Sequence, residues 1–216
     1  MKTCQSLAKR FTLRKSFQPG ANQAVAAQRS GANTHFIGAV GDDAAGKTML
    51  DLLTQEKINL AGITKMTNQS TGQAYVTVDD AGENQIMIHG GANMAFTPAD
   101  VEAHRDIIET SDFVVAQFES AVDSTVEAFK IAQAAGVRTI LNPAPAMEKV
   151  PAELLAVTDM IVPNETETET LTGIAITDEA SMLKASAALH ALGISAVIIT
   201  IGSKGAFYDI DGRHGI

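Results

Sequence analysis

Four polar or glycine-rich segments of this chain combine residue types that could bind a ligand. They are residues 20–23 (GANQ), 117–119 (QFE), 163–167 (PNETE) and 200–205 (TIGSKG). Their hydroxyls, amides and charged groups can hydrogen-bond to a polyol or a phosphate, and glycines allow close approach of the backbone. In sheets of parallel strands, ligands bind at the carboxyl ends of the strands, and these segments stand near such predicted ends.

The segment 200–205 follows the apolar run Ala196–Ile199, which predicts a buried strand. Gly202 and Gly205 would let the backbone approach a phosphate, and the Ser, Thr and Lys side chains could donate hydrogen bonds to it. An ordinary turn between two strands explains the same spacing. The segment does not match G-x-x-x-x-G-K-[ST], so it is not a P-loop.

Asn164 and Glu167 lie three residues apart just after the predicted strand 160–162. At the start of a helix, this spacing places both side chains on one side. A carboxylate there could hold Mg²⁺ through its waters beside a nucleotide. Equally, Asn164 could be the N-cap of the helix, with Glu167 completing a capping box.

Glu119 follows an apolar strand end and could accept hydrogen bonds from a polyol, although an acid in this position is more often solvated. Asn22 after Gly20 is either a residue at a helix start or a group that binds hydroxyls. The five histidines show no pair at the spacing of zinc ligands, and no G-x-S-x-G is present. These patterns disfavour a zinc site and the most recognisable hydrolase site.

The elements that must position these segments alternate between helices and strands. Strands are predicted over 34–40, 112–117, 137–141, 160–162 and 196–200, and helices over 21–29, 44–56, 98–109, 120–135, 152–156, 165–172 and 178–192. Strands separated by such helices imply right-handed crossovers and a mostly parallel sheet. Two β-branched runs around a turn predict a hairpin over 73–89. We expect one α/β domain from which this hairpin projects.

Composition and charge narrow the classes of function. The 216 residues carry 16 basic and 25 acidic side chains, a net charge of −9, which disfavours nonspecific binding to nucleic acids. No apolar run approaches the length of a membrane-spanning helix, and no signal peptide is evident, so we expect a soluble, cytoplasmic protein. The single cysteine, Cys4, cannot form an internal disulfide.

In order along the chain, six segments resemble the ribokinase branch of the ribokinase/phosphofructokinase-B sugar kinase family. They are 20–27 (GANQAVAA), 41–46 (GDDAAG), 89–93 (HGGAN), 142–146 (NPAPA), 163–167 (PNETE) and 200–205 (TIGSKG). Six ordered matches with family-like spacing are far more specific than any one of them. The resemblance implies a three-layer α/β/α fold.

The same resemblance implies ATP-dependent, Mg²⁺-assisted phosphorylation of a sugar, most simply the 5-hydroxyl of D-ribose. It implies that the sugar meets Gly20, Ala21, Asn22 and Glu119. It implies that Glu167 serves the metal and that the nucleotide meets Asn164, Thr200, Ile201, Gly202, Ser203, Lys204 and Gly205. The hairpin 73–89 would be the remnant of a lid that covers the sugar, and it could form a homodimer contact. A lid excludes water from a reaction that depends on positioning and charge.

The sequence also departs from the family pattern. Phe17-Gln18-Pro19 replaces the family's diglycine-lysine, and residues 1–16 contain no counterpart of its amino-terminal strand. The sequence ends at Ile216, and the resemblance places the family's Gly-Ala-Gly-Asp segment beyond this residue. That segment supplies the catalytic Asp, the anion hole, the adenine pocket and the monovalent-cation site. No catalytic residue is therefore assigned within residues 1–216, and the chain is expected to be inactive in this form.

Residues 1–19 are interpreted as a divergent or frame-shifted start. Five basic and no acidic side chains occupy residues 1–18. The codons for Cys4–Arg10 could, in another frame, encode the family's P-x-x-G-E-T. A mitochondrial transit peptide is an alternative interpretation of this basic segment. For the whole chain, the alternatives are another sugar or nucleoside kinase of the family, a noncatalytic binding module, or a fragment that dimerises through the hairpin.

Overall fold

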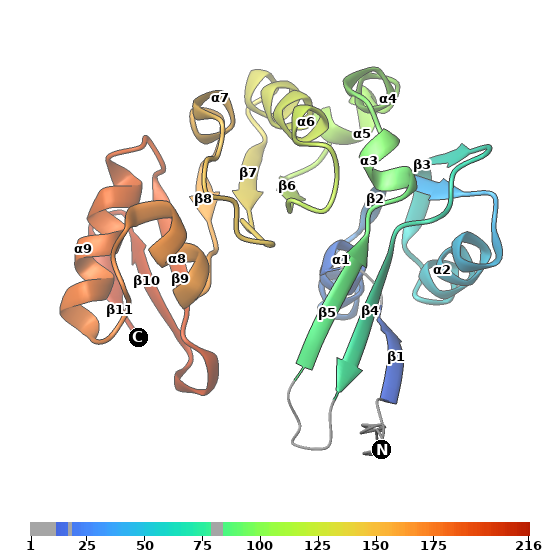
Figure 1. Cartoon of the computed structure of the whole chain (residues 1–216). Helices are drawn as coiled ribbons and strands as arrows, with labels where there is room; N and C mark the ends of the chain where they lie inside the picture. The colour runs from blue at the N-terminus through green and yellow to red at the C-terminus, as the bar shows by residue number, and fades with distance from the viewer. Residues whose placement is uncertain (1–11, 17–18, 79–83) are drawn as a thin grey trace, which may run out of the picture.

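The computed structural model describes residues 12–16, 19–78 and 84–216. Within these residues, helices and strands alternate along the chain, as the sequence predicts (Figure 1). The strands are β1 Thr12–Ser16, β2 His35–Gly41, β3 Asn59–Met66, β4 Gln73–Val78, β5 Asn84–His89, β6 Phe113–Ala116, β7 Arg138–Leu141, β8 Met160–Ile161, β9 Ala196–Thr200, β10 Ala206–Ile210 and β11 Arg213–Gly215. The helices are α1 Pro19–Arg29, α2 Ala44–Gln55, α3 Ala92–Ala95, α4 Pro98–Glu102, α5 Arg105–Glu109, α6 Val122–Ala134, α7 Ala152–Leu155, α8 Glu165–Thr172 and α9 Glu179–His190, with the 3₁₀ turn η1 Gly202–Lys204.

The largest sheet has six strands in the order β11-β10-β9-β8-β7-β6. Strands β6 to β9 are parallel, whereas β10 and β11 are antiparallel to their neighbours. The apolar run of β9 is largely buried because helices α8 and α9 pack against this end of the sheet. The predicted α/β class with mostly parallel strands is confirmed, and β10 and β11 extend the sheet beyond the predicted elements.

A second, two-stranded sheet consists of β2 and β3, which are parallel. Strand β3 was not predicted from the sequence, because a glycine interrupts its β-branched pattern. A Cβ atom on Gly62 would lie 2.7 Å from Cγ1 of Ile37 in β2. The glycine therefore permits the close approach of the two strands.

The third sheet contains β1, β4 and β5, and all its pairs are antiparallel. Strands β4 and β5 confirm the hairpin predicted over 73–89, whose turn at 79–83 lies outside the described residues. This sheet projects from the rest of the molecule (Figure 1). The predicted boundary between residues 19 and 20 stays a prediction, because residues 17–18 beside it are not described either.

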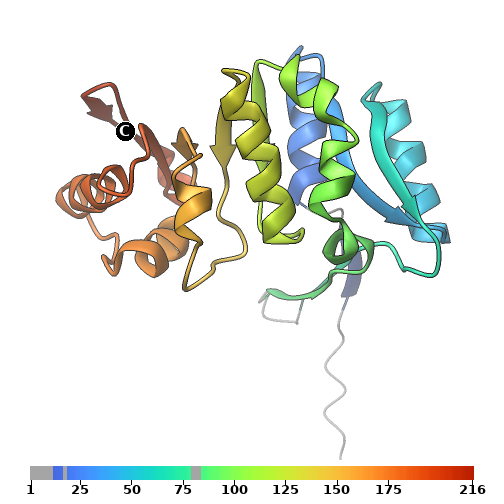
Figure 2. The same ribbon diagram turned by 90° about the horizontal axis from the view of Figure 1, so that it is seen from above.

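Helices flank the strands of the six-stranded sheet and of the β2-β3 sheet, in agreement with three layers. Figure 2 shows α6 and the α4–α5 segment in front of the strands and α1 behind them. The helix predicted over 98–109 is instead two helices, because His104 leaves the helical conformation (φ −118°, ψ 21°). The break lets both short helices pack against α6. None of the helices in the described part of the chain is long and apolar enough to cross a membrane.

One apolar cluster joins the six-stranded sheet to the sheet of β2 and β3. It contains Ala39 of β2, Val101 of α4 and Ile108 of α5, with Val114 of β6 packed against it. The helices α4, α5 and α6 thus cover β2 and β6 together, although these strands belong to different sheets. A larger cluster lies under the other end of the six-stranded sheet and includes Phe129 and Phe207, both fully buried.

Candidate active site

A cavity of about 140 Å³ lies between β2 and β6. Residues 36–39 of β2 and 114–116 of β6 line its two sides. Helix α1 contributes Gly20 and Ala21, and the loop after β6 contributes Glu119. The fold thus brings together two of the segments that were assigned to the sugar from the sequence.

Gly20 in the first turn of α1 lies against the end of β6. A Cβ atom on Gly20 would be 2.8 Å from Oε1 of Gln117, closer than carbon and oxygen atoms can approach. The side chain of Gln117 also donates a hydrogen bond to Oε1 of Gln23 one turn further along α1. A larger residue at position 20 would displace the end of the Gln117 side chain, so the glycine leaves room for Gln117 beside α1.

Glu119 is half-buried at the edge of this cavity. Burial raises the pKa of its carboxyl to about 7, because water no longer solvates the charged form fully. Near neutral pH, both forms of the carboxyl are therefore populated. Such a group can accept hydrogen bonds from sugar hydroxyls. The half-buried position therefore favours a sugar-binding carboxylate over a fully solvated one.

The loop that carries Glu119 is fixed by backbone hydrogen bonds from both sides. The amide of Phe118 donates to the carbonyl of Ala144 over 2.9 Å, and the side chain of Phe118 is buried. The amide of Asn142, at the end of β7, donates to the carbonyl of Ala116 over 2.9 Å. The position of Glu119 is therefore set by the ends of two parallel strands.

The remaining sugar candidate, Asn22, is exposed on α1 and is not among the residues that line the cavity. Conversely, Asn93 of α3 lines the cavity, although it was given no role from the sequence. The amide of Ala121 donates to the Asn93 carbonyl. Asn93 belongs to the segment 89–93, which resembles the kinase family. This resemblance could have indicated Asn93 as a candidate site residue.

After the interior strand β8, Asn164 and Glu167 form the capping box that the sequence allowed. The amide of Glu167 donates to Oδ1 of Asn164 over 2.8 Å, and the amide of Asn164 donates to a carboxylate oxygen of Glu167 over 2.9 Å. Nδ2 of Asn164 donates to the other carboxylate oxygen over 2.9 Å. Glu167 is only 6% exposed, so these bonds compensate for its burial.

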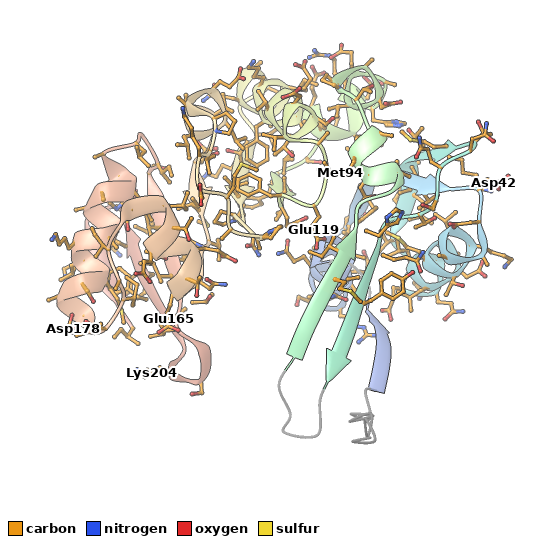
Figure 3. The ribbon with its side chains drawn as sticks, viewed as in Figure 1. Asp42, Met94, Glu119, Glu165, Asp178 and Lys204 are labelled. Carbon is orange, nitrogen blue, oxygen red and sulfur yellow. The ribbon has the colours of Figure 1, made fainter. Side chains whose placement is uncertain are left out.

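Thr200 lies directly beside Asn164. The two residues form an isolated parallel bridge, and the amide of Thr200 donates to the carbonyl of Pro163 over 2.9 Å. The carboxyl ends of β8 and β9 therefore place Asn164, Glu167 and the segment 200–205 next to one another. Figure 3 shows Glu165 and Lys204 together at this end, apart from Glu119.

The segment 200–205 makes the tight turn between β9 and the antiparallel strand β10. The amide of Ile201 donates to the carbonyl of Gly205 over 3.0 Å and closes the turn. Gly202 and Gly205 have φ of 57° and 103°, a region that residues with a side chain rarely adopt. Gly202, Ser203, Lys204 and Gly205 are exposed, so their groups face solvent, where a ligand could reach them.

Beside the carboxyl ends of β8 and β9, the buried carboxylate of Glu167 is a candidate group for holding a metal ion. In the described residues, no group of three or more His, Cys, Asp or Glu side chains could hold a metal. Both oxygens of Glu167 already accept hydrogen bonds, but each retains a further lone pair. The site therefore fits Mg²⁺ held through its waters, as Mg²⁺ commonly is beside phosphates.

Ile216, after which the resemblance places the family's catalytic Asp, directly follows β11. This strand is at one edge of the six-stranded sheet, whereas β6, which lines the cavity, is at the other edge. The side chain of Ile216 is 65% exposed, and the residue does not line the cavity. Ile216 is therefore not a site residue itself. The catalytic Asp is expected only after residue 216, so its assignment stays a prediction.

The layered α/β fold thus places one cavity between β2 and β6 and a second group of polar residues beside β9. The chain belongs to the pfkB family of carbohydrate kinases, whose family model matches residues 19–215.

The curated relatives of this chain include several ribokinases. The chain is 50% identical over 197 residues to the bifunctional ribokinase/ribose-5-phosphate isomerase A of Fructilactobacillus sanfranciscensis, covering 91% of this chain and 36% of the relative. It is 45% identical over 189 residues to the ribokinase of Staphylococcus aureus, covering 88% of this chain and 62% of the relative. The chain thus spans less than two thirds of the length of these relatives.

Among solved structures, the chain is similar to the Arabidopsis thaliana ribokinase complexed with ribose and ATP. The TM-score is 0.81 and the identity is 33%, over 89% of this chain and 63% of the plant protein. This likeness agrees with the three-layer α/β/α fold.

Proposed function

We propose that this chain carries the sugar and nucleotide sites for the ATP-dependent phosphorylation of D-ribose, and that the 216 residues alone bind these ligands without turnover, because no catalytic residue is assigned within them. In this proposal the sugar lies at the cavity between β2 and β6, and the nucleotide lies at the turn after β9. The observation that carries the proposal is the half-buried Glu119, which shares one cavity with the close contact of Gly20 and Gln117. The ribokinase relatives and the plant enzyme complexed with ribose and ATP support this choice of substrates.

At the sugar end, Glu119 accepts hydrogen bonds from ribose hydroxyls. Because the carboxyl is partly desolvated, each such bond is stronger than the same bond in bulk water. Gly20 and Ala21 supply a side of the cavity without bulky side chains, which leaves room for the sugar ring, and Asn22 contacts the sugar from the same turn. The sheet of β1, β4 and β5 acts as the lid.

At the nucleotide end, Gly202 and Gly205 let the backbone of the turn approach ATP, while Ser203 and Lys204 donate to its phosphates. Thr200, Ile201 and Asn164 complete this surface. Mg²⁺ neutralises charge on the phosphates when it is bound, and Glu167 is the residue that would hold its waters. The capping box keeps the Glu167 carboxylate in place throughout.

The partners are a small sugar and ATP, without nucleic acid or membrane, and a second copy could associate through the lid hairpin. The reaction would take place in the cytoplasm, where ATP is available. Another sugar or nucleoside kinase activity of the family is the alternative that sugar selectivity would reveal.

Calorimetric titration of the 216-residue chain with ribose tests the proposal, with xylose and adenosine as competing ligands. We expect ribose to bind most tightly. Glu119→Gln should weaken ribose binding by about tenfold to a hundredfold, because a hydrogen bond to a charged group contributes about 1.5 to 3 kcal/mol. The exposed Glu148→Gln is the matched control and should leave it unchanged. A folded chain that binds no ribose, or binds xylose or adenosine better, would contradict the proposal.

A further inference from the structure

The hairpin of β4 and β5 joins the rest of the molecule through two short segments that contact each other. One segment precedes β4 and the other follows β5. The amide of Ala92 donates to the carbonyl of Ser70 over 2.8 Å, and Oγ of Ser70 lies 2.7 Å from Nε2 of His89. Gly91 has φ of 50°, and a Cβ atom there would lie 2.2 Å from the carbonyl oxygen of Ser70. The two segments therefore cross at a point where a side chain does not fit.

Asp43, directly before α2, holds the segment that precedes β4. Its carboxylate accepts hydrogen bonds from the amide of Thr71 over 2.9 Å and from the hydroxyl of Thr71 over 2.6 Å. Oγ1 of Thr71 in turn accepts from the amide of Gly41 over 2.9 Å. Thr71 is only 3% exposed, so these partners compensate for the burial of its polar groups. The hydroxyl of Thr71, with the amides of Gly46 and Thr71, holds the pKa of Asp43 below its ordinary value, so the bonds are charge-assisted at neutral pH.

Two glycines allow Asp43 and Thr71 to lie this close to the end of β2. A Cβ atom on Gly41 would be 2.1 Å from the carbonyl oxygen of Gln69. A Cβ atom on Gly46 would be 2.5 Å from the carbonyl oxygen of Gly41 and 2.8 Å from Oγ1 of Thr71. Most of these neighbouring atoms belong to the backbone, which cannot change rotamer. The end of β2, the start of α2 and the segment before β4 are therefore packed backbone against backbone.

The crossing of the two segments lies next to the sugar cavity. Ala92, whose amide bonds to Ser70, begins α3 and is fully buried. The next residue, Asn93, lines the cavity. Helix α3 packs against β2, which lines the same cavity, and Figure 1 shows α3 at the end of β5 nearest the rest of the molecule. A continuous series of contacts therefore joins Asp43 to Asn93 through Thr71.

We propose that Asp43 is a positioning residue of the sugar site. Through Thr71, it fixes the point at which the proposed lid meets the rest of the molecule. Through the segment that follows β5, it also holds Asn93 at the cavity. Asp43 does not line the cavity itself, so it acts on the sugar through these other residues. The inference rests on the proposed function, because it concerns how the ribose site is held in place.

A cap of α2 is the simpler role for Asp43, and the second carboxylate oxygen separates the two roles. Oδ1 accepts from the amide of Gly46 over 2.8 Å, which is the capping bond. Oδ2 accepts from the amide of Thr71, which lies 28 residues further along the chain. Asp178, by contrast, caps α9 by accepting from the amide of Ser181 in the first turn of that helix. The carboxylate of Asp43 therefore caps its helix and, in addition, holds a distant segment.

Four variants of the full 216-residue chain separate these two roles. Asp43→Asn keeps the cap, because Asn is as good an N-cap as Asp, but its Nδ2 cannot accept from the amide of Thr71. Asp178→Asn is the matched control, since it makes the same substitution at the N-cap of α9, apart from Glu119 (Figure 3). Thr71→Val removes the hydroxyl and leaves the cap in place, whereas Thr71→Ser retains the hydroxyl. Thr71→Val also tests the inference if Asp43→Asn does not fold.

Amide hydrogen exchange, measured by NMR without ligand, reports on the crossing itself. In Asp43→Asn and Thr71→Val, the amides of Ala92, β4 and β5 should exchange about tenfold faster or more, while those of β9 exchange as in the wild type. Calorimetry should show ribose affinity reduced by about tenfold and ATP affinity unchanged. Thr71→Ser and Asp178→Asn should match the wild type in both measurements. A capping role alone would leave Asp43→Asn at wild-type values as well.

Unchanged exchange of the Ala92 amide in Asp43→Asn and Thr71→Val would overturn the inference, whether or not ribose binds. Faster exchange with unchanged ribose affinity would also overturn it, because the crossing would then not position the sugar site. An equal loss of ATP affinity would show general destabilisation in place of positioning. A wild-type chain that binds no ribose would contradict the proposed function, and the positioning role would fall with it even if the effect on exchange remained.

Discussion

The two ends of the candidate site are built in different ways. At the nucleotide end, Asn164, Glu167 and Thr200 are held by capping bonds, a turn and one bridge between neighbouring strands. At the sugar end, Gly20 and Glu119 come from segments far apart in the chain and line one cavity between β2 and β6. The first end is fixed locally, whereas the second depends on how α1, β2 and β6 pack.

The first prediction disturbs the packing at the sugar end and should have the largest effect. Gly20→Val places side-chain atoms where Oε1 of Gln117 now lies, so α1 or Gln117 must move. Because the end of the Gln117 side chain can change rotamer, the free energy of unfolding should fall by only about 1 kcal/mol, but Gln117 lines the cavity, so we expect ribose affinity to fall more than tenfold. Chemical denaturation and ribose titration measure the two effects.

Gly31 at the other end of α1 provides the control for this prediction. Its φ is 96°, but a Cβ atom there would contact nothing within 4 Å. Gly31→Ala should therefore lower stability through backbone strain alone and leave ribose affinity unchanged. Equal loss of ribose affinity in both variants would mean that the sugar end does not depend on the contact between Gly20 and Gln117.

The second prediction addresses the turn at the nucleotide end. Gly202 has φ of 57°, so Gly202→Val should lower the free energy of unfolding by about 1 to 2 kcal/mol. It should also weaken ATP binding while ribose binding stays intact. Separate calorimetric titrations with ATP and ribose measure the two affinities. Unchanged ATP affinity in Gly202→Val would show that the turn is not part of the nucleotide site.

The third prediction separates the two roles of Glu167. Glu167→Gln keeps a side-chain acceptor for the amide of Asn164 but removes the charge and the acceptor for Nδ2 of Asn164, so stability should fall by about 1 to 3 kcal/mol. If Glu167 also holds the waters of Mg²⁺, the variant needs more Mg²⁺ for the same ATP affinity. An identical Mg²⁺ dependence in the variant and the wild type would leave Glu167 with the capping role alone.

The smallest expected effect is on stability against pH. Burial raises the pKa of Glu119 to about 7 in the folded chain, above the 4.5 of a solvated glutamate. The folded state thus favours the protonated form, and this contribution to stability is full below pH 4.5 and is lost as pH rises to about 7. Thermal melts at about pH 5 and about pH 8, on either side of that pKa, give the change in melting temperature with pH. This change should be smaller for Glu119→Gln than for the wild-type chain. The same difference in both proteins would exclude Glu119 as the source.

The sequence predicts locally determined features of this molecule well. The helix at Glu165–Thr172 and the strand at Ala196–Thr200 agree residue for residue with the structure, because a capping sequence and an apolar run define them. The capping box of Asn164 and Glu167 was likewise one of the two interpretations of the sequence.

Features that depend on contacts between distant residues could not be predicted. No periodicity shows that Gln117 packs on Gly20, that β3 approaches β2 at Gly62, or that Asn93 lines the cavity. The raised pKa of Glu119 also follows from burial in the folded chain and not from its neighbours in sequence. The site roles themselves came from the resemblance to a family and remain proposals to be tested.

Proton release on ribose binding tests most directly the claim that Glu119 contacts the sugar. Hydroxyls that donate to the carboxylate stabilise its charged form and lower its pKa from about 7, so ribose binding near that pH should release protons. Calorimetry in buffers of different ionisation enthalpy measures this release, and Glu119→Gln should abolish it. A binding enthalpy for ribose that is the same in every buffer, with the wild-type chain, would contradict the account.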